Sequence, residues 1–180
     1  LIFITHPHFD HLSIDDIKKI AGKNTKIVAP KEAADKLSGF NAILVEPNKK
    51  YSINGIDFET VRAYNVRKER LSFHPKSSNW VGYIINIQGK RIYHAGDTDN
   101  IEEMKQVKCD IALIPIGGTY TMDIEEAIDA TKMINASYFV PMHYKALLGK
   151  EGSKKAEEKF SQEVKNSIIM EEIQEPSYSF

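Results

Sequence analysis

The chain opens on the stretch that decides its fold, Leu1-Ile2-Phe3-Ile4-Thr5-His6-Pro7-His8-Phe9-Asp10-His11. The first five residues form a β-branched and aromatic run, which predicts a buried strand that ends in a loop. Ser13 with Asp16 three residues later resembles a capping box, and isoleucines at three-residue spacing predict a short helix stopped by Gly22. A strand, a histidine-rich loop and a helix are therefore expected in succession.

Helical and extended patterns alternate along the rest of the chain. The predicted elements are strands at 26–29 and 42–45 with a helix at 31–37 between them, hairpins turning at Asn54-Gly55 and Gln88-Gly89, a helical stretch to about 104, a strand at 111–115, a helix at 123–134, a strand at 138–141, an amphipathic helix from Lys150 and a last strand at 168–170. This mixture predicts an α/β (α+β) fold with antiparallel strands among parallel ones.

Length and composition predict one globular domain. The 180 residues carry a formal net charge of -1, so no general positive field would attract nucleic acid. A single cysteine, the lack of an export signal and the lack of a long apolar run predict a cytoplasmic protein outside the membrane. Because the chain begins at Leu1 inside an apolar run, we expect a single domain over residues 1–180 that is truncated at its N-terminus. The oligomeric state stays open, and a homo-oligomer is compatible with the sequence.

The segment from His6 to His11 carries three imidazoles and one carboxylate within six positions. Such a density of ligand groups is typical of a metal site, because uncompensated imidazoles would repel one another once protonated. On extended backbone, His6 and His8 point the same way, whereas Asp10 and His11 can turn toward a second ion.

Three motifs resemble the metallo-β-lactamase superfamily: His-x-His-x-Asp-His at the start, Gly96-Asp97, and Pro141-Met142-His143-Tyr144. More narrowly, Ala63-Tyr64-Asn65, Phe73-His74-Pro75-Lys76 and the segment 117–123 resemble a branch of uncharacterised metal-dependent hydrolases related to the ascorbate-6-phosphate lactonase type. The likeness runs from Leu1 to about Tyr144. It implies a four-layer αββα sandwich of two mixed sheets with helices outside, lacking its N-terminal strands in this chain.

The resemblance also implies a set of metal ligands. One ion would be held by His6, His8 and a third histidine, the other by Asp10, His11 and His143, and Asp97 would bridge both. His74 is the third histidine by order in the chain. However, the family's usual ligand follows an apolar run directly, and here Tyr64-Asn65 occupies that place, so a loop histidine or a substrate contact stays the alternative for His74.

Several other residues have an expected role. His94 precedes the Gly-Asp turn and is predicted to orient a ligand by a hydrogen bond. Asp99 is predicted to be a turn or cap residue, and Cys109 a small buried apolar residue. Five side chains are candidates for lining a pocket: Lys76, Trp80, Tyr120, Tyr144 and Lys145.

The predicted activity is hydrolysis of a small ester, lactone or phosphate ester by a water activated between two divalent ions. Zinc is the default metal, and manganese, iron or nickel also suit nitrogen and carboxylate ligands. Asp10, Asp97 and His143 are the predicted catalytic residues: Asp10 would steer or accept the proton of the water, and His143 or Tyr144 would stabilise a leaving oxygen. A nuclease or phosphodiesterase acting on RNA or nucleotides, and a metal-containing binding protein without catalysis, stay open as alternatives.

Overall fold

Two β-sheets form the centre of the molecule. The structure, a computed structural model, describes residues 1–171. The first sheet has three parallel strands in the order β1 (Ile2–Phe3), β2 (Ile27–Pro30) and β3 (Ala42–Val45). The second has six strands in sequence order: β4 (Lys50–Ile53), β5 (Ile56–Arg62), β6 (Val81–Ile87), β7 (Lys90–His94), β8 (Lys108–Pro115) and β9 (Asn135–Met142).

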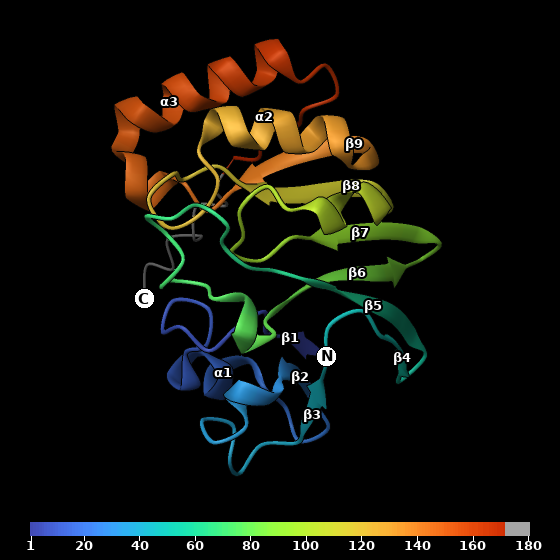
Figure 1. The fold of residues 1–180 in the computed structure, drawn as a ribbon. Helices are drawn as coiled ribbons and strands as arrows, with labels where there is room; N and C mark the ends of the chain where they lie inside the picture. Colours follow the sequence, from blue (N-terminus) through green and yellow to red (C-terminus); the bar gives the residue numbers. More distant parts are fainter. Residues whose placement is uncertain (172–180) are drawn as a thin grey trace, which may run out of the picture.

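Helices cover the outer faces of both sheets. The α-helices are α1 (Ile14–Ile20), α2 (Ile124–Met133) and α3 (Lys145–Glu163), and the 3-10 helices are η1 (Lys31–Ala33), η2 (Lys76–Ser78) and η3 (Glu102–Gln106). Figure 1 shows α1 to the left of the three-stranded sheet, and α2 and α3 above the other sheet. No helix in the described part of the chain is long and apolar enough to cross a membrane.

The sheets pack face to face through an apolar cluster to which both contribute. Val28 and Val45 of the first sheet lie against Phe58 and Tyr83 of the second, and Phe3 meets both aromatic rings edge-on at centroid distances of 5.0 and 5.1 Å. Separate clusters lie between α1 and the first sheet and between α2, α3 and the second. The expected four-layer αββα sandwich is therefore confirmed.

Three details of the expected fold are wrong. Over the described residues the first sheet is entirely parallel rather than mixed. The helix expected at 31–37 is the 3-10 turn η1 followed by further turns, because the short crossover from β2 to β3 leaves no room for several helical turns and two loops. The strand expected at 168–170 is reduced to one bridge between Phe139 and Ser167. Ile168 and Met170 are 41% and 60% exposed, so burial of their side chains adds little free energy that would favour a longer strand.

Helix ends follow the sequence closely. The Asp123 side chain accepts from Glu126 N, and the Glu126 side chain accepts from Asp123 N, which confirms the predicted capping box of α2. Ser13 accepts from Asp16 N at the start of α1. The last helix, α3, begins at Lys145, five residues before the predicted Lys150. Gly149, at φ +63°, breaks it into two pieces, and the predicted helix corresponds to the second piece.

Parallel strand order brings distant motifs to one edge. β7, β8 and β9 run parallel, so the turn after β7 that carries Asp97 lies beside the end of β9 that carries His143. The first sheet reaches the same edge, because Val81 N donates to Thr5 O (3.2 Å) and the Tyr83 hydroxyl donates to Ile4 O (2.7 Å). The loop after β1 is thereby fixed opposite the ends of β7 and β9.

Gly96 allows this junction to close. It has φ +68°, and an added Cβ would lie 3.2 Å from both Thr5 Cβ and Val81 O. We predict that Gly96→Ala lowers the free energy of unfolding by more than the roughly 1 to 3 kcal/mol of left-handed strain alone, because the new methyl also crowds Thr5. Urea unfolding followed by circular dichroism measures the loss. Gly55→Ala is the matched control, since Gly55 has φ +76° with nothing within 4 Å of the added atom. Equal losses in the two variants would contradict the crowding argument.

Candidate metal centre

The loop after β1 directs two histidines inward. His6 is 1% exposed, and its Nδ1 lies 2.9 Å from the Thr5 hydroxyl oxygen, which leaves Nε2 facing the interior. His6 Nε2 lies 3.1 Å from His8 Nδ1, so the two rings converge through one nitrogen each. The backbone then turns, with Leu12 N donating to His8 O (2.8 Å), and carries Asp10 and His11 to the other side of the cluster.

Asp97 is the common neighbour of the imidazoles. Its side chain is 4% exposed, and Oδ2 lies 3.3 Å from His74 Nε2, 3.4 Å from His11 Nε2, 3.5 Å from His143 Nε2 and 4.0 Å from His6 Nε2. Asp10 Oδ2, on a side chain that is 43% exposed, lies 3.4 Å from His11 Nε2 and 3.5 Å from His143 Nε2. One carboxylate is thus buried at the centre of the cluster, and the other stands at its open side.

His143 is held by a strained backbone at the end of β9. It has φ +55°, a conformation that costs a non-glycine residue about 1 to 3 kcal/mol. Gly117 accommodates it, because a Cβ at that position would lie 2.4 Å from His143 O. The segment 117–123 therefore packs directly against the His143 backbone.

The protonation tendencies of His6, His8 and Asp97 suit ligand groups, whereas His11 would have to lose a proton to bind metal. Burial and the neighbouring His11 lower the pKa of His6 to about 2, and burial and His74 lower the pKa of His8, so both rings stay neutral. Burial would raise the pKa of Asp97, but the neighbouring His11 and His74 outweigh it and hold the pKa well below its usual range. Burial opposes the charged form of His11, yet Asp97 and then Asp10 raise its pKa. Neutral imidazoles and ionised carboxylates are the forms that bind metal.

The distances between ligand atoms fit divalent ions. Two ligands of a tetrahedral ion, each about 2.0 to 2.1 Å from it, stand about 3.3 Å apart. His6 and His8 approach at 3.1 Å, and His11 and His143 at 3.2 Å through their Nε2 atoms. Among the described residues, three buried atoms of the cluster lack a hydrogen-bond partner: His74 Nε2, Asp97 Oδ1 and His143 Nδ1. Buried polar atoms are rarely left unpaired, so His74 Nε2 and Asp97 Oδ1 point to missing ligand bonds. For His143 the nitrogen that faces the cluster is Nε2, not the unpaired Nδ1.

The structure brings all seven predicted ligands together in three overlapping groups whose ligand atoms lie within 4.8 Å of one another. These groups are His6, His8 and His74; His6, His11 and Asp97; and Asp10, His11 and His143. The first and third match the two sets implied by the sequence. The uncertain third histidine thus has a place in the cluster, although its binding of metal stays a prediction.

Comparison with known proteins gives the family. The sequence family described as Beta-lactamase superfamily domain matches residues 1–144. The chain belongs to the metallo-β-lactamase superfamily. A relative named metal-dependent hydrolase from Methanosphaera stadtmanae is 35% identical over 180 residues, covering 94% of this chain and 75% of its own length. Another with that name, from Thermoplasma volcanium, is 34% identical over 149 residues, and the chain spans only 65% of its length.

Solved structures agree with this superfamily membership. A crystal structure of a Parabacteroides distasonis protein has a TM-score of 0.82 at 31% identity, covering 93% of this chain and 74% of that one. A structure described as a novel metallo hydrolase from Ignicoccus hospitalis has a TM-score of 0.74 at 27% identity, covering 94% of this chain and 75% of that one.

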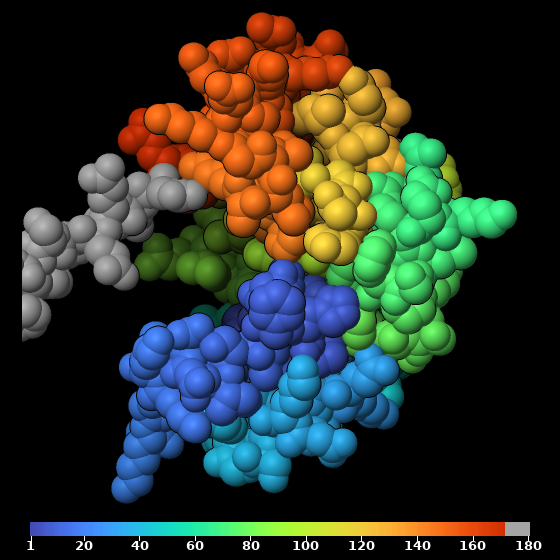
Figure 2. All heavy atoms as spheres, turned by 90° about the vertical axis from the view of Figure 1, so that its left-hand side faces the viewer, coloured from blue at the N-terminus to red at the C-terminus, as the bar shows by residue number. Residues whose placement is uncertain are grey.

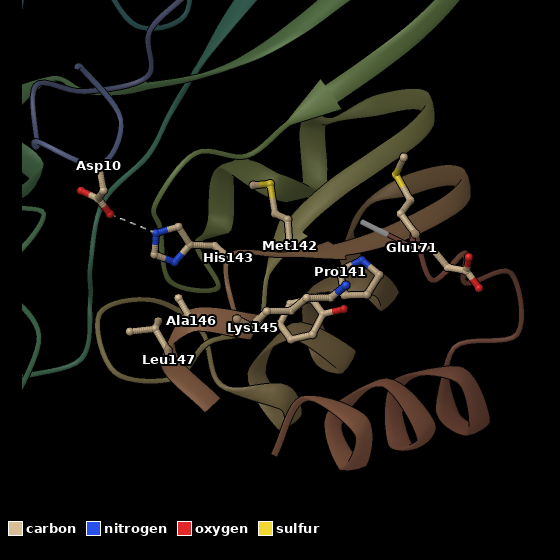
Figure 3. A pocket seen from close by; sticks show the side chains of 10 residues that line it. Asp10, Pro141, Met142, His143, Lys145, Ala146, Leu147 and Glu171 are labelled. Atoms are coloured by element: carbon tan, nitrogen blue, oxygen red, sulfur yellow. Dashed lines mark ion pairs between the residues drawn. The ribbon is translucent and has the colours of Figure 1, made fainter. Parts of the chain in front are cut away.

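Within this metallo-β-lactamase domain, a cavity opens beside the exposed carboxylate. It has a volume of about 430 Å³ and is lined by Asp10, Pro141, Met142, His143, Tyr144, Lys145, Ala146, Leu147, Met170 and Glu171. Figure 3 shows Asp10 reaching toward His143 from the facing loop. In Figure 2 the blue N-terminal segment meets the orange start of α3 on this face. A small substrate in the cavity would contact the metal ligands from the solvent side.

Other candidate residues have different surroundings. Trp80 packs its ring against those of His6, His8 and His74 at centroid distances of 5.0, 4.8 and 5.6 Å. His94 Nδ1 accepts from Gly96 N (3.2 Å), so its hydrogen bond holds the backbone turn before Asp97 rather than a ligand ring, and burial and then His11 lower its pKa to about 4.

The remaining pocket candidates divide. Lys145 and Tyr144 both line the cavity, and the Tyr144 hydroxyl donates to Glu157 Oε1 (2.5 Å), which turns its proton toward α3. Lys76 donates to the Tyr64 hydroxyl (2.9 Å). Tyr120 packs edge-on against Phe73 at 4.8 Å.

Asp99 and Cys109 were predicted to be structural. Cys109 is partly buried against the helix-covered core, and burial raises its pKa to about 11. For Asp99 the prediction of a simple turn or cap is wrong. It is fully buried and accepts from Asn65 Nδ2, Val66 N and Arg67 N. Its donors come from a segment more than thirty residues earlier, which local sequence patterns do not reveal.

The geometry predicts metal content. Protein purified without added metal should carry about two transition ions per chain by elemental analysis, because two ligand groups share Asp97. Asp97→Ala should reduce the content sharply, since it removes the ligand atom nearest to both groups. Asp129→Ala is the control, because Asp129 is exposed on α2 and pairs with Lys132. A folded wild type that takes up no metal after reconstitution would contradict the prediction that this cluster binds metal ions.

Proposed function

We propose that this domain is a metal-dependent hydrolase in which a dinuclear centre activates water for attack on a small ester, lactone or phosphate ester. The observation that carries the proposal is the position of Asp97 Oδ2. It lies within 4.0 Å of Nε2 of His6 and His74, which belong to the first ligand group, and of Nε2 of His11 and His143, which belong to the second. A buried carboxylate between two ligand groups is the arrangement that a bridged pair of ions requires.

In this proposal His6, His8 and His74 hold one ion, Asp10, His11 and His143 hold the other, and Asp97 bridges them. Nitrogen and carboxylate ligands suit zinc, and they also suit manganese, iron or nickel. When bound, such ions supply positive charge that lowers the pKa of water and stabilises negative charge on a carbonyl or phosphoryl oxygen.

Asp10 would take the proton of the attacking water. At 43% exposure it is the most accessible carboxylate of the cluster, and it borders the cavity. A carboxylate within hydrogen-bond reach of the water can steer its lone pair toward the substrate and accept its proton. His143, on the same wall, would stabilise the leaving oxygen.

The open side of the cluster favours catalysis over a purely structural metal site. Structural sites are closed by protein ligands, whereas catalytic sites keep a position open to water or substrate. Asp10 and His143 are 43% and 21% exposed, while His6, His74 and Asp97 are buried. The cavity volume of about 430 Å³ suits a small molecule.

Action on RNA or nucleotides is the second candidate, since the same ligand pattern supports phosphodiester cleavage. The formal net charge of -1 argues against it. A steep loss of RNA binding with rising salt would revive it. The cytoplasmic location stays a prediction, and the oligomeric state stays open.

The test is hydrolysis of a panel of lactones, aryl esters and phosphate esters by protein stripped with a chelator and then reloaded with each metal. Activity should vanish on stripping and return on reloading. Asp10→Asn should lower kcat by roughly 100-fold to 10,000-fold, the range for loss of a general base. Asp15→Asn is the control, because the Asp15 side chain is 89% exposed. Unchanged turnover in a folded Asp97→Ala protein would overturn the proposal.

A further inference from the structure

His74 reaches the cluster from an irregular connection rather than from a strand end. It lies in the segment between β5 and β6, yet its side chain is 1% exposed. Asn65 fixes this segment at two points: Asn65 N donates to His74 O (2.8 Å), and Asn65 Oδ1 lies 2.9 Å from His74 Nδ1. The position of His74 therefore depends on a neighbour nine residues earlier in the chain.

The orientation of the Asn65 amide is determined by its other contacts. Nδ2 donates to Asp99 Oδ1 (3.0 Å) and to Tyr120 O (3.0 Å), and both of these atoms can only accept. The amide oxygen must then face His74. Because an amide oxygen accepts and never donates, the ring proton of His74 has to reside on Nδ1. This leaves Nε2 as the nitrogen that faces the cluster, 3.3 Å from Asp97 Oδ2 and available to a metal ion.

Asp99 is itself held firmly. It is fully buried, and Oδ2 accepts from Val66 N (2.7 Å) and Arg67 N (2.9 Å). Arg70 Nε lies 3.1 Å from Asp99 Oδ1. Three N–H donors and a guanidinium thus hold this carboxylate in place.

The chain of contacts continues to the start of α2. Arg70 donates from Nη2 to both oxygens of Glu126, at 2.8 and 2.7 Å, and from Nη1 to Thr121 O and to Gly118 O (3.2 Å). Glu126 is also part of the capping box of α2. The series α2, Arg70, Asp99, Asn65 and His74 therefore links a rigid helix end to one ring of the metal cluster.

We propose that Asn65, fixed by Asp99, is a positioning residue that sets the tautomer and orientation of His74 and so strengthens metal binding at the first site. Neither residue belongs to the candidate ligand groups or lines the cavity. The inference rests on the proposed metal centre. Partners of this kind, which fix a ligating imidazole by a hydrogen bond to its other nitrogen, change metal affinity by about 10-fold to 100-fold when removed.

The first test needs no variant. Long-range ¹H–¹⁵N NMR of the metal-free wild type at pH 8 should show His74 with its proton on Nδ1, once its signals are assigned by comparison with His74→Ala. A wild-type His74 protonated on Nε2 would overturn the inference, whatever the activity of the protein.

The second test is titration of metal-free protein with Zn²⁺ or Co²⁺, using the visible Co²⁺ spectrum to follow the site. Asn65→Ala should weaken binding of the ion at the first site by about 10-fold to 100-fold and alter the Co²⁺ bands. Asn86→Ala, an identical truncation at an exposed position of β6, should leave both unchanged.

A double variant separates a positioning role from a general loss of structure. In the His74→Ala background, Asn65→Ala should cause no further loss of affinity, because its effect passes through the missing ring. An equal further loss would overturn the inference. If the wild type binds metal and a folded Asn65→Ala protein binds it with the same affinity, this inference alone would be overturned. If the wild type binds no divalent ion, the proposed function would be overturned as well.

Discussion

The Asp97 carboxylate is the group on which the rest of the structure depends. It is buried, where an unpaired carboxylate would be strongly destabilised, and it is surrounded by imidazole nitrogens at 3.3 to 4.0 Å. The four histidines come from the loop after β1, the connection before β6 and the end of β9. Their mutual proximity would be unfavourable if all of them were charged, so a cation between the rings and the carboxylate would stabilise the whole cluster.

The packing of the two sheets brings the histidines and Asp97 together at one edge. β7 and β9 run parallel with β8 between them, so Asp97 and His143 emerge at one edge of the larger sheet. The smaller sheet supplies His6 to His11, and it is joined to the larger one beside the cluster by the bond from Val81 N to Thr5 O. Gly96 and Gly117 permit backbone approaches at this edge that a side chain would block. The contacts that pack the two sheets together therefore also fix the geometry of the cluster.

Rigidity is distributed unevenly around the cluster. Trp80 packs behind His6, His8 and His74, and the series from Arg70 through Asp99 to Asn65 restrains the same side. Asp10 and His143 border the cavity and are more exposed. A fixed wall and an accessible wall are what hydrolysis of a small substrate needs, because orientation is set on one side while water and substrate enter on the other.

The sequence by itself determined the layered α/β class and the capping of α2, because strand patterns and capping pairs are local properties of the chain. It predicted a metal site at His6 to His11 from the density of ligand groups, and Asp97 and His143 as further ligands from a family resemblance. It indicated His74 as the third histidine ligand only by its order in the chain. It missed Asn65 as a contact and took Asp99 for a turn residue, since their partners lie 9 to 34 residues away. The helix expected at 31–37 failed because a short parallel crossover overrides helix propensity. Which side chains meet across the two sheets, and which nitrogen of His74 faces Asp97, was decided only by tertiary packing, because long-range contacts and buried hydrogen bonds have no local signature.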